Sequence, residues 1–88
     1  MKFYLSGNLM RFSDYDREIE VEADTVYGAI LTLVERYPAL KPVLLDRENY
    51  LRGVHQIFLD GAMISSEYLD MPVSPDADIT ILTALAGG

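Results

Sequence analysis

The 88-residue chain has the length of one small domain, and half of its residues are apolar, which is typical of a globular protein and argues against a disordered one. It contains no cysteine, which excludes disulfides and thiolate metal sites, and its net charge of −7 disfavours binding to nucleic-acid phosphates. The first residues do not resemble a signal peptide and no apolar stretch has membrane-spanning length, so we expect a cytoplasmic protein with no membrane or nucleic-acid partner.

The first part of the chain predicts two strands. Residues Lys2–Leu5 are rich in aromatic and branched side chains. Residues 17–23 alternate between apolar and acidic positions, and this period of two is typical of a half-buried strand. We expect the segment between them, residues 8–14, to form a loop.

A helix is predicted over residues 25–37. Asp24 or Thr25 provides a side chain that caps its start, and Pro38 ends it because the residue before a proline is disfavoured in the helical conformation. Apolar residues recur between these limits at three- and four-residue spacing, which places them on one stripe: Val26, Ala29, Ile30, Leu33, Val34 and Tyr37. A short helical turn is expected within residues 40–45.

The last part of the chain predicts three more strands. Residues 53–59 and Ala62–Ile64 flank Asp60-Gly61, a pair that favours a hairpin turn because both positions require positive φ. A turn near Pro75 then leads into the strand Asp78–Thr83. The order β-β-α-β-β-β predicts an α+β fold of the β-grasp type, a mixed sheet with one main helix packed across it. We expect residues 1–83 to form this domain and residues 84–88 to form a flexible tail.

Few residues carry recognisable chemistry. His55 is the only histidine, and we interpret it as a surface or packing residue rather than a catalytic one or a metal ligand. The acidic run from Asp14 fails as a calcium loop, because Ile19 stands where glycine is required and Thr25 where glutamate is required. No phosphate-binding glycine loop is present. We therefore expect no enzyme activity, no metal and no cofactor bound by this chain.

The sequence ends on Ala86-Gly87-Gly88, immediately after a predicted strand. Two residues without side chains give a slender peptide that fits a narrow cleft, which suits activation of the Gly88 carboxylate by another enzyme. A frayed chain end is the alternative interpretation, since termini are often poorly ordered. The acidic surface likewise has two interpretations, steering of a basic partner or simple solubility.

Three stretches match the pattern of one known family. Residues 76–88 combine a turn ending in aspartate, a strand and a small-residue tail that closes on Gly-Gly. The other two are Tyr37-Pro38-Ala39-Leu40 and Phe58-Leu59-Asp60-Gly61, although Asp60 stands where the family usually has asparagine. The chain thus resembles the ThiS/MoaD-type sulfur carriers, prokaryotic relatives of ubiquitin, over nearly its whole length. Residues 46–52 make it more similar to the molybdopterin-type and amino-acid-biosynthesis carriers than to the shortest thiamine-type ones.

The resemblance implies a chemical role for the tail. An E1-like enzyme would use ATP to adenylate Gly88, and a sulfur donor would displace AMP to leave a thiocarboxylate. Gly87 and Ala86 would thread into the partner, and the sulfur would pass to a biosynthetic enzyme. A ubiquitin-like modifier conjugated through Gly88 and a β-grasp interaction module with an incidental diglycine are the alternatives. The receiving pathway, and whether a protease exposes Gly88, stay open.

The resemblance also implies a partner-binding patch at Leu82 and Met63, with Leu9 or Met10 nearby. Composition alone favours burial of all four residues. The alternation that turns Ile79 and Ile81 inward places Leu82 on the opposite face of its strand. At the first-strand edge, where the family often has an aromatic residue, this chain has Ser6.

Overall fold

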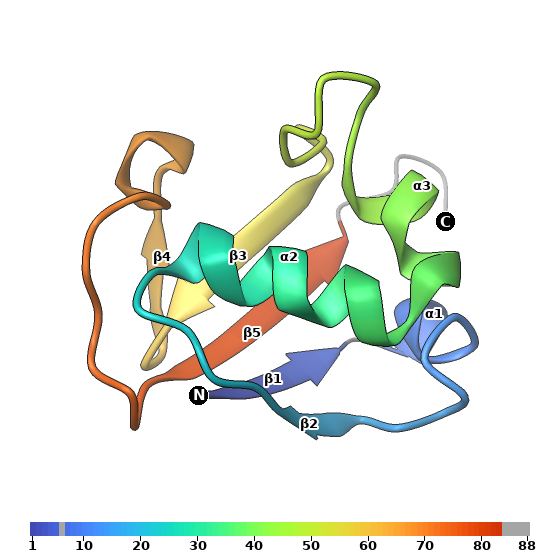
Figure 1. The fold of residues 1–88 in the computed structure, drawn as a ribbon, viewed down its shortest axis with the longest axis horizontal. Coiled ribbons are helices and arrows are strands. Elements are labelled where there is room, and N and C mark those ends of the chain that lie inside the picture. Colours follow the sequence, from blue (N-terminus) through green and yellow to red (C-terminus); the bar gives the residue numbers. More distant parts are fainter. Residues whose placement is uncertain (6, 84–88) are drawn as a thin grey trace.

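Two layers make up the structure, a five-stranded sheet and a helical layer that covers one of its faces (Figure 1). The computed structural model describes residues 1–5 and 7–83. In chain order the elements are β1 (Lys2–Leu5), α1 (Gly7–Met10), β2 (Glu18–Glu20), α2 (Val26–Arg36), the 3₁₀ turn η1 (Pro38–Leu40), α3 (Lys41–Leu44), β3 (His55–Leu59), β4 (Ala62–Ile64), the 3₁₀ turn η2 (Ser66–Tyr68) and β5 (Asp78–Thr83).

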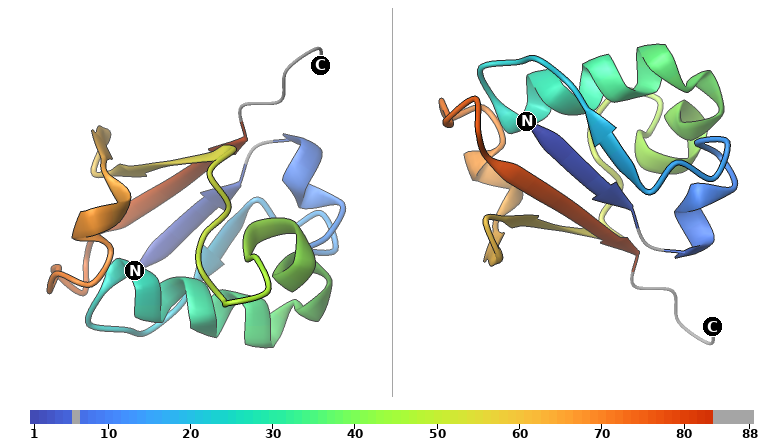
Figure 2. Two further views of the ribbon diagram at one scale, coloured as in Figure 1. Left: turned by 90° about the horizontal axis from the view of Figure 1, so that it is seen from above. Right: turned by 90° about the horizontal axis from the view of Figure 1, so that it is seen from below.

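The sheet is mixed, with the strand order β2-β1-β5-β3-β4. The first and last strands, β1 and β5, run parallel at its centre, and the other neighbouring strands are antiparallel. Strands paired in parallel cannot be joined by a tight hairpin, and the chain between these two includes α2, which packs across one face (Figure 2). The predicted α+β, β-grasp architecture is therefore confirmed.

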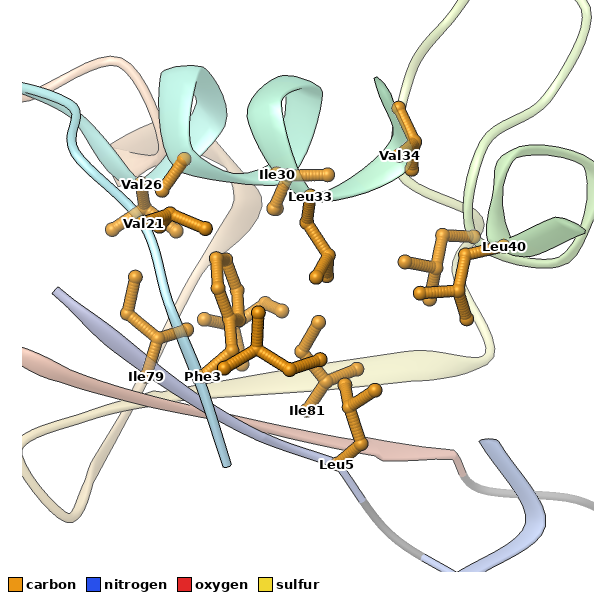
Figure 3. Packing of buried hydrophobic residues seen from close by; sticks show 14 of the residues in the cluster. Phe3, Leu5, Val21, Val26, Ile30, Leu33, Val34, Leu40, Ile79 and Ile81 are labelled. Atoms are coloured by element: carbon orange, nitrogen blue, oxygen red, sulfur yellow. The ribbon is translucent and has the colours of Figure 1, made fainter. Parts of the chain in front are cut away.

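The core lies between α2 and the face of the sheet that this helix covers. Successive side chains of a strand point to opposite faces, so Phe3 and Leu5 on β1 share the inner face with their partners on β5, Ile79 and Ile81. All four are buried. The helix meets them with the apolar stripe predicted from its periodicity (Figure 3), of which five residues are buried: Val26, Ala29, Ile30, Leu33 and Val34.

Local side-chain chemistry sets the limits of α2. Thr25, and not Asp24, is the N-cap: its backbone is extended and its hydroxyl oxygen accepts a hydrogen bond from the Gly28 amide at 2.9 Å. The helix ends at Arg36, two residues before Pro38. The helical turn expected within residues 40–45 is also present, as η1 and α3.

The hairpin between β3 and β4 has the predicted turn. Asp60 and Gly61 adopt φ values of 50° and 87°, the left-handed conformation that this turn requires. The Asp60 side chain has a second role, because its Oδ1 accepts a hydrogen bond from the Asp78 amide at 2.9 Å. The turn is thereby tied to the start of β5.

The loop predicted over residues 8–14 is wrong in part, because its first residues belong to α1. Ser13 holds the segment that follows α1. It is fully buried, and its hydroxyl lies 3.0 Å from the Met10 carbonyl oxygen and 2.9 Å from that of Asp16. Two strands are also shorter than predicted, since β2 covers only Glu18–Glu20 and β3 begins at His55.

Replacing Leu33 with alanine tests the packing of α2. Leu33 has no exposed surface, so the substitution removes buried methyl groups and leaves a cavity between helix and sheet. We expect the free energy of unfolding to fall by about 2–5 kcal/mol, measured by urea denaturation. Leu31→Ala on the exposed side of the same helix is the control, and an equal effect of both variants would contradict this packing.

Candidate functional site

The residues expected to carry the chemistry, Ala86, Gly87 and Gly88, lie outside the described residues. The described chain ends at Thr83, the last residue of β5, which pairs with His55 on β3. Because β5 is the middle strand of the sheet, the tail sequence is joined to the centre of the fold and not to an edge strand.

The helices leave one face of the sheet uncovered, opposite α2 (Figure 2), and this face is here called the outer face. It carries exposed apolar side chains on β4 and β5. Leu82 on β5 is 40% exposed and Met63 on β4 is 62% exposed. Leu82 lies outward because its neighbour Ile81 points into the core, which is the register that the alternation predicts. The part of both residues in binding a partner stays a prediction.

Strand pairing adds two aromatic residues that sequence reasoning missed. Phe58 on β3 pairs with Met63 of β4 on one side and with Thr80 of β5 on the other. Thr80 pairs in turn with Tyr4 of β1. These side chains form one row across four strands, and Leu82 lies next to it, opposite Gln56. We call Tyr4, Phe58, Met63 and Leu82 the outer apolar patch.

The signal for these aromatic residues was of unequal strength. Tyr4 could have been found, because β1 alternates and its neighbours Phe3 and Leu5 are both expected in the core. Phe58 lies in the apolar run 57–59, in which the sequence alone does not show which side chain points outward. Its place on the outer face follows from the pairing of β3 with β5. A strand's neighbours are not encoded in its own periodicity.

The structure corrects Leu9, one of the two other residues predicted for the patch, while the role of Met10 stays a prediction. Leu9 is only 2% exposed and belongs to the core, so its assignment to a binding surface is wrong. Met10 is half-buried and packs against the same core. The reason is α1, which replaces the expected loop and turns Leu9 inward.

Charged residues lie on the outer face at the opposite edge of the sheet from Met63. Glu18 and Glu20 are exposed on β2, and the Lys2 ammonium on β1 lies 3.1 Å from Glu18 Oε1. The side-chain hydrogen bond to Glu18, with the attraction of that carboxylate, raises the pKa of Lys2 above its ordinary value. The edge of the sheet formed by β2 is therefore charged, beside the apolar patch.

Other sites of chemistry are not evident in the part of the chain that the structure describes. His55 is buried and hydrogen-bonded within the fold, as expected of a packing residue. Within residues 1–5 and 7–83, no group of histidine and acidic side chains is arranged to hold a metal ion. Over the same residues, no helix has both the length and the hydropathy needed to cross a membrane.

Comparisons with known proteins identify related folds. No protein-family model and no curated protein sequence matches this chain. Among solved structures, SAMP1 (small archaeal modifier protein 1) from Methanosarcina acetivorans is 28% identical, with a TM-score of 0.86 over 99% of this chain and 94% of its own. SAMP1 from Haloferax volcanii is 21% identical, with a TM-score of 0.82 over 100% and 98% of the two chains. The Amycolatopsis orientalis BexX/CysO complex contains a chain that is 22% identical, with a TM-score of 0.85 over 99% and 98%.

The structural neighbours are ThiS/MoaD-type ubiquitin-like proteins. This finding confirms the resemblance predicted from the sequence. The ThiS/MoaD-type neighbours are small carrier or modifier proteins, and the matched chains have nearly the same length as this one. The similarity therefore covers the whole β-grasp domain.

A charge placed in the outer apolar patch tests its predicted role. Leu82→Glu should weaken the complex with the expected activating enzyme by more than about 1 kcal/mol, because an apolar anchor at the centre of an interface does not tolerate a desolvated carboxylate. Isothermal titration calorimetry gives the affinity, and thermal unfolding should change little because the residue is exposed.

Leu31→Glu is the matched control, because Leu31 is 37% exposed but lies on α2, on the opposite layer of the molecule. The two variants carry the same change in charge and size. Equal losses of affinity would show that the added charge, and not the position of Leu82, causes the effect.

Proposed function

We propose that this chain is a sulfur carrier whose Gly88 carboxylate is adenylated by an E1-like enzyme and then converted to a thiocarboxylate. The observation that carries the proposal is the join between the fold and the tail: a β-grasp domain of the ThiS/MoaD type whose central strand β5 is followed directly by five small or apolar residues ending in Gly87-Gly88. On this proposal the chain is a substrate of enzymes and not an enzyme itself.

The reaction needs activation because of the charge on the carboxylate. An α-carboxyl group has a pKa of about 3.5 and is ionised at neutral pH, so its carbonyl carbon is a poor electrophile. Attack of a carboxylate oxygen on the α-phosphorus of ATP forms an acyl adenylate and releases pyrophosphate. A hydrosulfide equivalent from the sulfur donor then attacks the carbonyl carbon, AMP leaves with the electron pair of the broken C–O bond, and the thiocarboxylate remains.

The partner supplies everything that this chain lacks for the reaction. We assign ATP and the sulfur donor to the E1-like enzyme, and the sequence itself has no phosphate-binding glycine loop. Gly87 and Ala86 provide a narrow approach to the partner's active site, since neither carries a bulky side chain. ATP is a co-substrate of the cytoplasm, which agrees with the location expected from the sequence.

The outer apolar patch provides the surface that docks on the activating enzyme. Its exposed members, Met63 and Leu82, lie on the strands β4 and β5, and Leu82 is one residue from the end of the described chain. A partner seated there meets the fold beside the point where the tail begins. The BexX/CysO complex supports a protein partner of this kind, because a structural neighbour is found there with a second protein. A downstream enzyme that accepts the sulfur is the second partner.

A protein modifier is the second candidate function. It is favoured by the names of the two SAMP1 neighbours, which are small archaeal modifier proteins, one of them 28% identical to this chain. The same adenylation of Gly88 would then precede an amide bond to a lysine of a target protein. Intact-mass analysis of the protein from its native cells separates the two, since the carrier gains one sulfur in place of one oxygen and the modifier forms large adducts.

Two changes in the tail test the sulfur-carrier proposal. Deleting Gly88 moves the carboxylate back by about 3.5 Å, outside productive alignment, and Gly87→Val adds a branched side chain where the cleft admits none. We expect thiocarboxylate formation to fall below about 1% of the wild-type rate in both. The assay is mass spectrometry after incubation with the cognate E1-like enzyme, ATP and a sulfur source.

Gly53→Val is the matched control for the added side chain. A Cβ at Gly53 meets no atom within 4 Å, so a side chain added there begins in open space. This variant should keep the wild-type rate, and all three should keep the wild-type melting temperature because none alters the core. Normal sulfur incorporation by the Gly88 deletion would refute the proposal.

A further inference from the structure

The inner face of the sheet changes character at the end nearest the tail. Along β5 its inward positions are Ile79, Ile81 and Thr83, and the β3 partners of the last two are Ile57 and His55. The inward-pointing residue pairs between β3 and β5 are therefore apolar until the last pair, in which His55 faces Thr83. This polar pair lies at the point where the tail sequence begins.

Both ring nitrogens of His55 are engaged. Nε2 lies 2.7 Å from the carbonyl oxygen of Val43 in α3, and Nδ1 lies 3.0 Å from Thr83 Oγ1. A backbone carbonyl only accepts hydrogen bonds, so Nε2 carries the proton and donates it. In the neutral ring Nδ1 is then the acceptor, and the Thr83 hydroxyl donates to it. Because His55 is only 7% exposed, water competes little for these two bonds.

The helix that receives the Nε2 bond is itself fixed. Leu44 of α3 is fully buried, and its carbonyl oxygen accepts a hydrogen bond from the Arg52 amide at 2.8 Å. The Arg52 side chain holds the neighbouring carbonyl of Pro42, with a distance of 3.0 Å from Nε. Through His55, the last residue of β5 is thus connected to an anchored part of the core.

We propose that His55 is a positioning residue for the tail. By holding Thr83 with a directional hydrogen bond, it keeps β5 ordered to its last residue, so that the activating enzyme does not have to order the end of this strand. An apolar pair at this row would pack but would not fix the direction of the chain. The expected effect on activation of the carrier rests on the proposed function. The expected effect on the order of the strand end does not.

Release of this contact should loosen the end of β5. Leu82 and Thr83 would then have to be ordered on the partner, and every additional ordered residue costs conformational entropy. The cost falls on binding of the carrier and not on the chemistry at Gly88. We therefore expect the KM for the carrier to rise about five- to tenfold while kcat stays within about twofold.

Thr83→Val is the decisive variant, because it keeps the size and the branched shape of the side chain and removes only the hydroxyl. Thr83→Ser restores the hydroxyl and should restore the wild-type KM. Ser74→Ala is the control, since it also removes a side-chain hydrogen bond, from the Asp76 amide at 3.1 Å, but in the turn before β5 at the far end of the strand.

Two measurements separate this inference from the proposed function. ¹⁵N relaxation of Thr83→Val should show backbone order parameters at positions 82 and 83 falling from about 0.85 toward about 0.6, while Ile79 keeps its value. Kinetics of activation then give KM and kcat. Unchanged order at the strand end, an equal loss of order along all of β5, or an unchanged KM would overturn the inference. Wild-type protein that is never activated would refute the proposed function, and the relaxation data alone would then decide the positioning role.

Discussion

The parallel pairing of β1 with β5 is the constraint on which the rest of the fold depends. It places the first and last strands side by side at the centre of the sheet, so the chain between them has to supply both edges and the covering helix. The register also aligns the core, because Phe3 faces Ile79 and Leu5 faces Ile81 beneath α2. The N-terminal amino group reinforces this arrangement by donating hydrogen bonds to the carbonyl oxygens of Val21 and Pro75, both at 2.8 Å.

The same pairing separates the core of the molecule from its proposed docking surface, because they lie on opposite faces of the sheet. The inner face supplies stability through its contact with α2, and the outer face leaves apolar side chains open to a partner. Since adjacent residues of β5 point to opposite faces, Ile81 contributes to the core and Leu82 to the face that we propose as the docking surface. Substitutions at these two neighbouring positions should therefore have different consequences, one on folding and the other on recognition.

Periodicity predicted the parts of the fold whose residues interact along the chain. The stripe of α2, the Thr25 cap and the Asp60-Gly61 turn are local, and all three are present. The position of Leu9 was predicted wrongly, because α1 is too short for a recognisable period and is held by tertiary packing. Phe58 was missed for a related reason, since its place on the outer face follows from strand pairing over a long sequence separation. The tail was identified from composition, outside the described residues.

The two edges of the sheet determine how readily copies of this protein could pair strand to strand. An exposed apolar face beside open strand edges is a common origin of fibrous assembly, because unpaired backbone groups accept further strands. Here β2 and β4 are the edge strands and each is only three residues long. The side chains flanking Ile19 on β2 are both glutamates. Neither edge offers a long, uncharged strand for pairing, which agrees with the proposal that a partner binds the face of the sheet and not its edges.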